Sequence, residues 1–88
     1  MNEVELERGL KMLANRRRLA IVNLLRKRRG LTVNGIAETI RLSLTATSRH
    51  LNMLERAGFL EKEQRSLEVY YRIAESPPAV YKALSSIF

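Results

Sequence analysis

The sequence has no cysteine and no tryptophan, and only one histidine among its 88 residues. Without cysteine the chain can form neither a disulfide framework nor a thiolate metal site, and a single imidazole does not make a metal centre. We therefore expect neither a metal nor a cofactor. No apolar run approaches the roughly 18 residues that a membrane helix needs, and the acidic residues 1–5 do not resemble a signal peptide. The sequence predicts a cytoplasmic protein that makes no membrane contact.

The residue sets that catalysis requires are also missing. There is no Ser/His/Asp or Cys/His arrangement, no glycine-rich phosphate loop and no pair of carboxylates suited to acid–base work. We therefore predict that the protein is not an enzyme. With 45% hydrophobic residues, the chain is expected to fold as one domain spanning residues 1–88.

Positive charge is concentrated in the middle of the chain. The formal net charge is +7, and residues 16–56 alone carry ten Lys or Arg and two Glu, whereas residues 57–88 carry four basic and four acidic side chains. Such asymmetry favours a polyanionic partner, which we predict to be double-stranded DNA. The alternative is a basic protein that its charge merely keeps in solution.

Hydrophobic spacing predicts five helices and one β-hairpin. The predicted helices span residues 3–14, 16–28, 33–40, 44–57 and 77–88, and the predicted strands span 60–64 and 68–73, around a turn at 65–67. Asn15, Thr32, Ser43 and Ser76 are expected as helix N-caps, and Gly58 is expected just past the end of the fourth helix. The fold class is mainly α with a small β-hairpin, the element order of a winged helix-turn-helix.

The helix at 44–57 has one apolar face and one small, polar, cationic face. Leu44, Thr47, Leu51 and Leu54 are expected to face the core. The opposite face could enter a major groove, where hydroxyls, a methyl group and a guanidinium can contact base edges. The predicted DNA contacts on this helix are Thr45, Ala46, Ser48, Arg49, His50 and Asn52.

Two other interpretations of this face stay open. Its small residues could be ordinary solvated helix positions, and Arg49 could bind a phosphate rather than guanine. For His50, phosphate contact and structural packing carry equal weight.

Other cations are candidates for contacts with the DNA backbone. Three consecutive arginines at the start of the second helix oppose the helix dipole, which suggests that they serve phosphates or pair with acids of the first helix. The hairpin is expected to present Arg65 at its tip. The predicted phosphate and wing contacts are Arg16, Arg17, Arg18, Arg41, Lys62 and Arg65. The cations at 26–29 end the second helix, where positive charge is favoured anyway, so a solvated surface is expected there.

Five short motifs occur in the order and spacing of a known family. They are LANRRRLAIV (13–22), LTVNGIA (31–37), SRHL (48–51), AGFL (57–60) and VYYRI (69–73). Over about residues 10–74 the chain resembles the ArsR-like repressors. The resemblance implies a winged helix-turn-helix and a homodimeric prokaryotic transcriptional repressor.

The sequence departs from this family where metals are sensed. Metal-responsive members carry a Cys-x-Cys pair in the third helix, where this chain has Thr32 and Asn34. Other members place Asp and His ligands in the last helix, and residues 77–88 contain neither. The resemblance therefore does not carry a metal response to this chain.

The two terminal helices, 3–14 and 77–88, are predicted to form a homodimer interface. Each has an apolar stripe that a small monomer would leave partly in water. The predicted interface residues are Leu6, Leu10, Leu13, Val80, Tyr81, Leu84, Ile87 and Phe88. Alternatively, both helices fold back onto their own subunit. A two-fold dimer would place two reading helices about 34 Å apart, which implies an inverted-repeat operator.

Taken together, these features predict a sequence-specific repressor. The alternatives are an architectural DNA-binding protein that reads no sequence, and a winged helix used for protein–protein contact.

Overall fold

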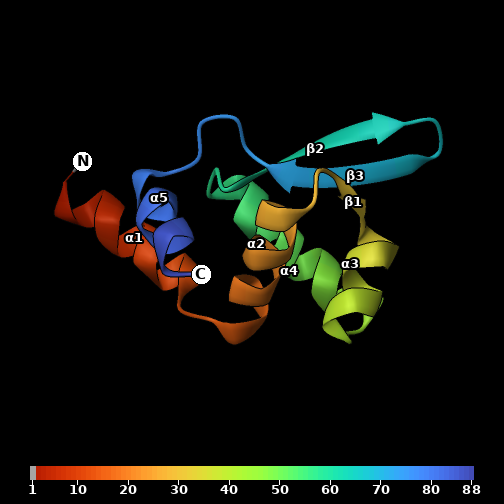
Figure 1. The fold of residues 1–88 in the computed structure, drawn as a ribbon, viewed down its shortest axis with the longest axis horizontal. Helices are drawn as coiled ribbons and strands as arrows, with labels where there is room; N and C mark the ends of the chain where they lie inside the picture. The colour runs from red at the N-terminus through yellow and green to blue at the C-terminus, as the bar shows by residue number, and fades with distance from the viewer. Residues whose placement is uncertain (1) are drawn as a thin grey trace.

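A computed structural model describes residues 2–88, in which a small antiparallel sheet lies along one side of five helices (Figure 1). The elements are α1 (Glu3–Leu13), α2 (Arg16–Lys27), β1 (Leu31–Thr32), α3 (Val33–Ile40), α4 (Leu44–Arg56), β2 (Leu60–Arg65), β3 (Glu68–Ile73) and α5 (Ala79–Ile87). The predicted fold class is confirmed: α3 and α4 form the helix-turn-helix, and β2 and β3 form the wing.

Side-chain caps determine where the middle helices begin. Asn15, Thr32 and Ser43 each accept a hydrogen bond from the backbone N–H three residues later, as predicted. The prediction for the last helix was wrong, since α5 begins at Ala79 and no side chain caps it. The reason is the pair Pro77-Pro78, because a residue that precedes proline is pushed toward extended backbone, so the helix starts only after the second proline.

The sheet contains a strand that the sequence did not predict. β1 pairs with β3 through Leu31 opposite Tyr71 and Thr32 opposite Tyr70, giving the strand order β1-β3-β2. A two-residue strand is too short to show a period of two in the sequence. The hairpin is also one residue longer than expected, because β2 reaches Arg65 and only residues 66 and 67 form the turn.

The core lies between α2, α3, α4 and one face of the sheet. Its fully buried side chains include Ile21, Ile36, Leu51, Leu54 and Phe59, each with none of its surface exposed. Thr47 is buried as expected. Leu44 is 50% exposed, contrary to prediction, because the first residue of α4 lies beyond the edge of this core.

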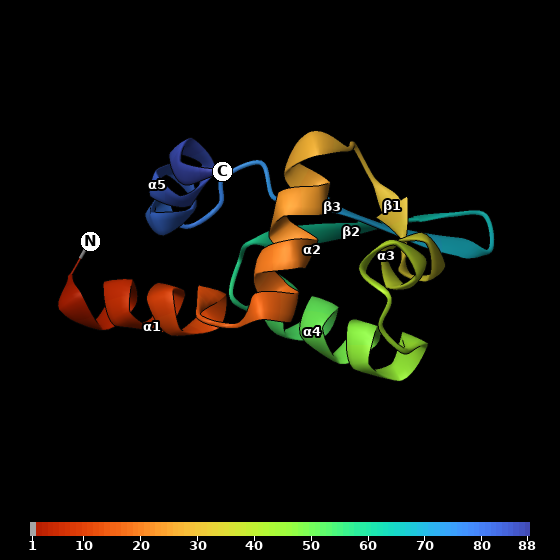
Figure 2. The same cartoon turned by 60° about the horizontal axis from the view of Figure 1, so that its bottom comes forward.

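At one end of the molecule, α1 and α5 lie beside each other, next to the body formed by α2–α4 and the sheet (Figure 2). Gly9 allows this close approach, since a Cβ built there would lie 2.9 Å from Val80 Cγ1. Leu13 is 5% exposed and belongs to the core of its own protomer, which corrects its assignment to a dimer interface. It is buried because it is the last residue of α1, where the chain turns into α2.

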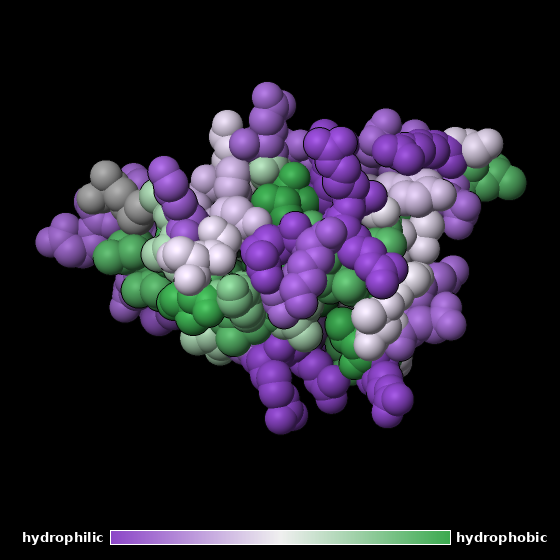
Figure 3. Space-filling view, in the orientation of Figure 1, coloured by the Kyte–Doolittle hydropathy of each residue, from purple (hydrophilic) through white to green (hydrophobic). Residues whose placement is uncertain are grey.

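The other predicted interface residues divide into an inner and an outer group. Val80, Tyr81 and Leu84 are half-buried against the protomer's own core. The outer group is 40–79% exposed and consists of Leu6, Leu10, Ile87 and Phe88. Figure 3 shows hydrophobic surface gathered over the α1 end of the molecule.

Candidate nucleic-acid interface

The outer face of α4 is open to solvent along its length. Its inner residues are held in the core, and the Ser43 hydroxyl accepts a hydrogen bond from the Ala46 N–H and fixes the first turn. Thr45, Arg49 and Asn52 are exposed. Ala46, Ser48 and His50 are half-buried, so none of the six predicted residues is closed off from solvent.

Arg56 extends this face and was missed in the sequence. It is exposed and lies seven positions after Arg49 and four after Asn52, so the three side chains share one side of the helix. The same spacing in the sequence could have identified it. The outer face of α4 therefore carries two guanidiniums, one in the middle of the helix and one at its end.

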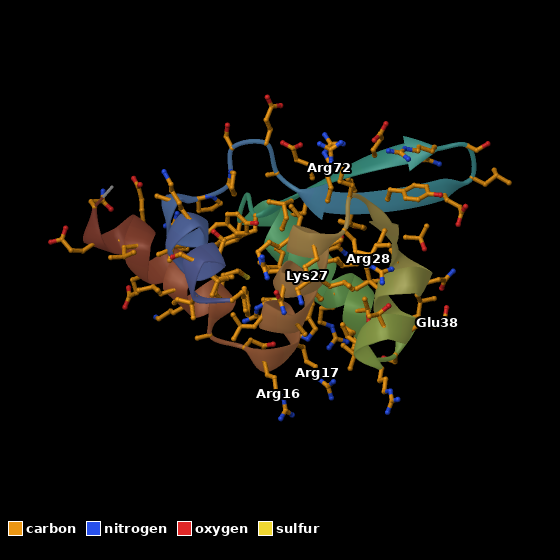
Figure 4. All side chains as sticks on the ribbon, in the orientation of Figure 1. Arg16, Arg17, Lys27, Arg28, Glu38 and Arg72 are labelled. Carbon is orange, nitrogen blue, oxygen red and sulfur yellow. The ribbon has the colours of Figure 1, made fainter. Side chains whose placement is uncertain are left out.

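A second group of cations lies where α2 begins and α3 ends. Arg17 Nη1 donates to the carbonyl oxygen of Ile40, 3.4 Å away, and so satisfies the C-terminus of α3. Arg41 follows in the left-handed conformation, with φ 57° and ψ 53°, and its side chain is exposed. In Figure 4, Arg16 and Arg17 project from the base of α2, at the opposite side of the molecule from Arg72. Arg41 lies in the turn that leads into α4, and Arg17 contacts the last residue of α3 just before that turn.

The guanidinium of Arg18 is held by several contacts within the protein. The prediction that Arg18 contacts a phosphate is therefore corrected. Its Nε donates to the carbonyl oxygen of Met12, and its Nη1 lies 3.4 Å from His50 Nδ1 and 3.8 Å from the sulfur of Met53. The side chain therefore joins the end of α1 to α4. The three arginines at positions 16–18 point in different directions because successive helix residues are about 100° apart.

His50 is held by this contact rather than left free. Arg18 can only donate, so His50 Nδ1 must be the acceptor and therefore carries no proton. Burial, followed by the charges of Arg18, Arg49 and Arg17, lowers the pKa of His50 below its ordinary value of 6.5. The geometry supports the packing interpretation of His50.

The hairpin offers fewer free cations than the sequence predicted. Arg65 is the last residue of β2 rather than the tip, and its guanidinium pairs with Glu63 at 3.2 Å and stacks over Tyr70 at 4.8 Å. Lys62 pairs with Glu55 of α4 at 3.5 Å. The exposed tip consists of Ser66 and Leu67.

Of the two tyrosines of β3, Tyr71 packs in the core and Tyr70 is half-buried. Tyr71 is 5% exposed, and its hydroxyl donates to Asn52 Oδ1 across 3.4 Å. Burial raises the pKa of Tyr71, so the hydroxyl keeps its proton and remains a donor at neutral pH. The contact fixes the hairpin against the C-terminal half of α4.

Two further properties bear on what this surface can do. Within residues 2–88, no three His, Asp or Glu side chains come together in a way that could hold a metal ion. In the same part of the chain, no helix has the length and apolarity to cross a membrane.

Comparison with known proteins places these features among bacterial regulators. The profile of the family described as "Bacterial regulatory protein, arsR family" matches residues 15–62. The transcriptional repressor PagR of Bacillus anthracis is 38% identical over 64 residues, which make up 73% of this chain. The chain spans 64% of the length of PagR.

Solved structures agree with the fold. The homodimeric winged helix-turn-helix DNA-binding domain of Mb0332 from Mycobacterium bovis, a possible ArsR-family regulator, has a TM-score of 0.81 and 35% identity. That match covers 94% of this chain and 76% of the other. The transcriptional regulator HlyU of Vibrio vulnificus has a TM-score of 0.80 and 33% identity, with 99% of this chain and 91% of the other covered.

Proposed function

Because the chain belongs to the arsR family of bacterial regulatory proteins, we propose that it is a homodimeric repressor that binds double-stranded DNA. PagR is a transcriptional repressor, and the Mb0332 fragment is a homodimeric DNA-binding domain, which supports this assignment. The protein acts by occupying an operator rather than by catalysis, and it needs no cofactor or metal for this. We expect it in the cytoplasm, where bacterial operators lie.

The observation that carries the proposal is the exposed, cationic outer face of α4. Thr45, Ala46, Ser48 and Arg49 lie on the first turns of this helix, the part that reads bases in helix-turn-helix proteins. A half-buried alanine and serine keep the helix slim enough to approach base edges. Arg49 pairs with guanine, because its guanidinium matches the O6 and N7 acceptors.

Phosphate contacts come from the cations that flank this helix. Arg17 and Arg41 lie at the α3–α4 turn, Arg16 projects from the base of α2, and Arg56 lies at the C-terminal end of α4. Of the two acids in the basic segment, Glu55 is neutralised by Lys62. The surface therefore keeps a positive field that attracts the DNA backbone. Lys62 and Arg65 add little, since both are paired with glutamate.

The dimer forms through α1 and α5. Leu6, Leu10, Ile87 and Phe88 are exposed apolar side chains at one end of the protomer, and burying them against a second copy removes this surface from water. Two-fold pairing presents two α4 helices to successive major grooves about 34 Å apart. The operator is therefore an inverted repeat.

Selection from random DNA duplexes tests the function directly. The proposal predicts enrichment of a motif with dyad symmetry, and no enrichment would favour an architectural protein. On the best site, Arg49→Ala is expected to cost about 1–3 kcal/mol of binding free energy and to relax preference at one position of each half-site. Arg29→Ala removes the same charge beyond the far end of α2 and serves as the control.

Two other results would change the assignment. An equal loss for Arg49→Ala on specific and random DNA would make Arg49 a phosphate contact. No binding to any duplex at about 50 mM salt, where electrostatic affinity is strong, would favour a protein–protein module instead.

A further inference from the structure

A cleft lies on the part of the molecule that the proposed DNA-binding surface does not use. It occupies about 550 Å³ between the C-terminal end of α2, the outer face of the hairpin and α5. In Figure 4, Arg28 and Arg72 border this region, whereas Arg16 and Arg17 project from the opposite side. The volume is within the range of small-molecule sites, about 300–1,000 Å³.

One wall of the cleft carries cations that have no acidic partner. Arg28 and Arg29 are exposed, and in residues 2–88 no carboxylate lies within 4.0 Å of either guanidinium. Arg26 also lines the cleft, but its guanidinium is already engaged, because it donates to Asn23 Oδ1 at 3.0 Å and stacks over Phe88 at 5.4 Å. The unpaired guanidiniums of Arg28 and Arg29 therefore offer hydrogen bonds that an anion could accept.

On the opposite wall Arg65 and Arg72 are already paired with carboxylates, and the exposed carboxylate of Glu75 also borders the cleft, so the two walls differ in charge. Glu63 accepts hydrogen bonds from Arg65 and Arg72, each at 3.2 Å, and Arg72 also pairs with Glu61 at 2.9 Å. An anion entering the cleft therefore finds its free partners on the α2 side. The charges on the hairpin side hold one another in place.

The floor of the cleft is apolar and aromatic. Leu25 and Ile73 line it, together with Tyr70 of the hairpin and Tyr81 of α5. Figure 3 shows hydrophobic surface between hydrophilic side chains in this region, above the centre of the molecule. Inorganic phosphate or sulfate could use the arginines but would leave this floor in water. The lining therefore matches a ligand that has both a charged group and an apolar body.

We propose that this cleft binds a small organic anion, a carboxylate or phosphate monoester attached to an aromatic or branched apolar group. The guanidiniums of Arg28 and Arg29 hold the anionic oxygens, since the planar fork of arginine fits carboxylate and phosphate. The apolar body packs on Leu25 and Ile73.

Phenyl phosphate is the probe ligand. Inorganic phosphate and phenol, which represent its charged group and its apolar group, are the comparison ligands. Isothermal titration of the intact protein is expected to give a dissociation constant for phenyl phosphate about tenfold or more below that of either half, because both parts of the cleft are used. In a nitrogen-15 NMR titration, the largest shifts are expected at Gly30 and Tyr70. This map uses the unmodified protein and does not depend on a variant folding.

Two matched double variants separate a site from general charge attraction. Arg28→Gln/Arg29→Gln is expected to weaken phenyl phosphate binding about tenfold, because each charge-assisted hydrogen bond contributes substantially. Arg16→Gln/Arg49→Gln removes the same charge from the DNA-binding face and is expected to leave phenyl phosphate binding unchanged while weakening DNA binding.

Three results would overturn the proposal. The first is that phenyl phosphate shows no saturable binding up to about 10 mM, which corresponds to less than about 3 kcal/mol of affinity. The second is that the two double variants weaken phenyl phosphate binding equally. The third is that the NMR shifts are centred on α4. Each of these outcomes is independent of whether the protein binds DNA, so the cleft and the repressor assignment fail separately.

Discussion

Arg41 combines two properties that a substitution can separate. It ends α3 in the left-handed conformation, with φ 57° and ψ 53°, and its exposed side chain lies beside the start of α4. Left-handed backbone costs a residue with a Cβ about 1–2 kcal/mol, and glycine escapes this cost. The same side chain is proposed to contact a phosphate. Arg41→Gly should therefore stabilise the fold and weaken DNA binding at the same time.

The expected size of each effect follows from the structure. Glycine also makes the unfolded chain more flexible, which lowers the free energy of unfolding by about 0.5–1 kcal/mol. Relief of the left-handed strain exceeds this loss, so Arg41→Gly should raise the free energy of unfolding by about 0.5–1 kcal/mol. In DNA binding, one phosphate contact fewer per half-site should reduce the slope of log K against log salt by about 0.9 for each protomer. Urea denaturation at fixed protein concentration measures the first effect, and binding titrations at several salt concentrations measure the second.

Two further variants isolate the causes. Arg41→Lys keeps the charge and the backbone penalty, so both stability and salt dependence should stay near those of the unmodified protein. Arg41→Asn tolerates the left-handed region but lacks charge, so it should lose the salt slope while gaining part of the stability. If Arg41→Gly left the salt slope intact, Arg41 would not be a phosphate contact. If it lowered stability, the side chain would contribute more to the fold than its backbone costs.

Three other predictions concern the remaining parts of the molecule. Leu10→Glu should give a folded monomer in sedimentation velocity, because Leu10 is 50% exposed at the proposed interface, whereas Asn34→Glu on α3 should leave a dimer. Gly9→Ala should lower the free energy of unfolding by about 1 kcal/mol, because a clash with Val80 that costs about 1–3 kcal/mol exceeds the gain of about 1 kcal/mol in helix propensity. In urea unfolding, the effects of Gly9→Ala and Val80→Ala should be clearly non-additive. Because the pKa of His50 is lowered on folding, the unfolded chain takes up the proton first, so stability should be greatest above pH 6.5 and fall below it. His50→Gln should flatten this dependence in melts at pH 5–7.5, and an unchanged profile would show that the pH dependence does not come from the lowered pKa of His50.

The sequence predicted the helices well because their signals are local. Caps at Asn15, Thr32 and Ser43 and the apolar spacing of Thr47 and Leu51 depend on residues within one or two turns, which a sequence shows directly. The outer face of α4 follows from the inner face by geometry alone. The open surface of the candidate interface was therefore predictable from the sequence.

The errors concern contacts between segments far apart in the chain. Arg18 was assigned to phosphates because nothing local shows that the carbonyl oxygen of Met12 and the ring of His50 will lie beside it. Arg65 was expected at the hairpin tip because a one-residue change in strand length cannot be read from so short a pattern. The cleft beside Arg28 was not predicted for the same reason, since its walls come from α2, the hairpin and α5.

The short strand β1 has a consequence for how a regulator of this shape can change. It joins the chain just before α3 to the middle strand of the sheet, while Tyr71 and Lys62 attach the hairpin to α4. These contacts join α4 and the wing into one body, so in the proposed homodimer any adjustment between the two protomers would fall to α1 and α5. Substitutions at that end would alter the distance between the two recognised half-sites without changing which bases are read, whereas substitutions on α4 would do the reverse.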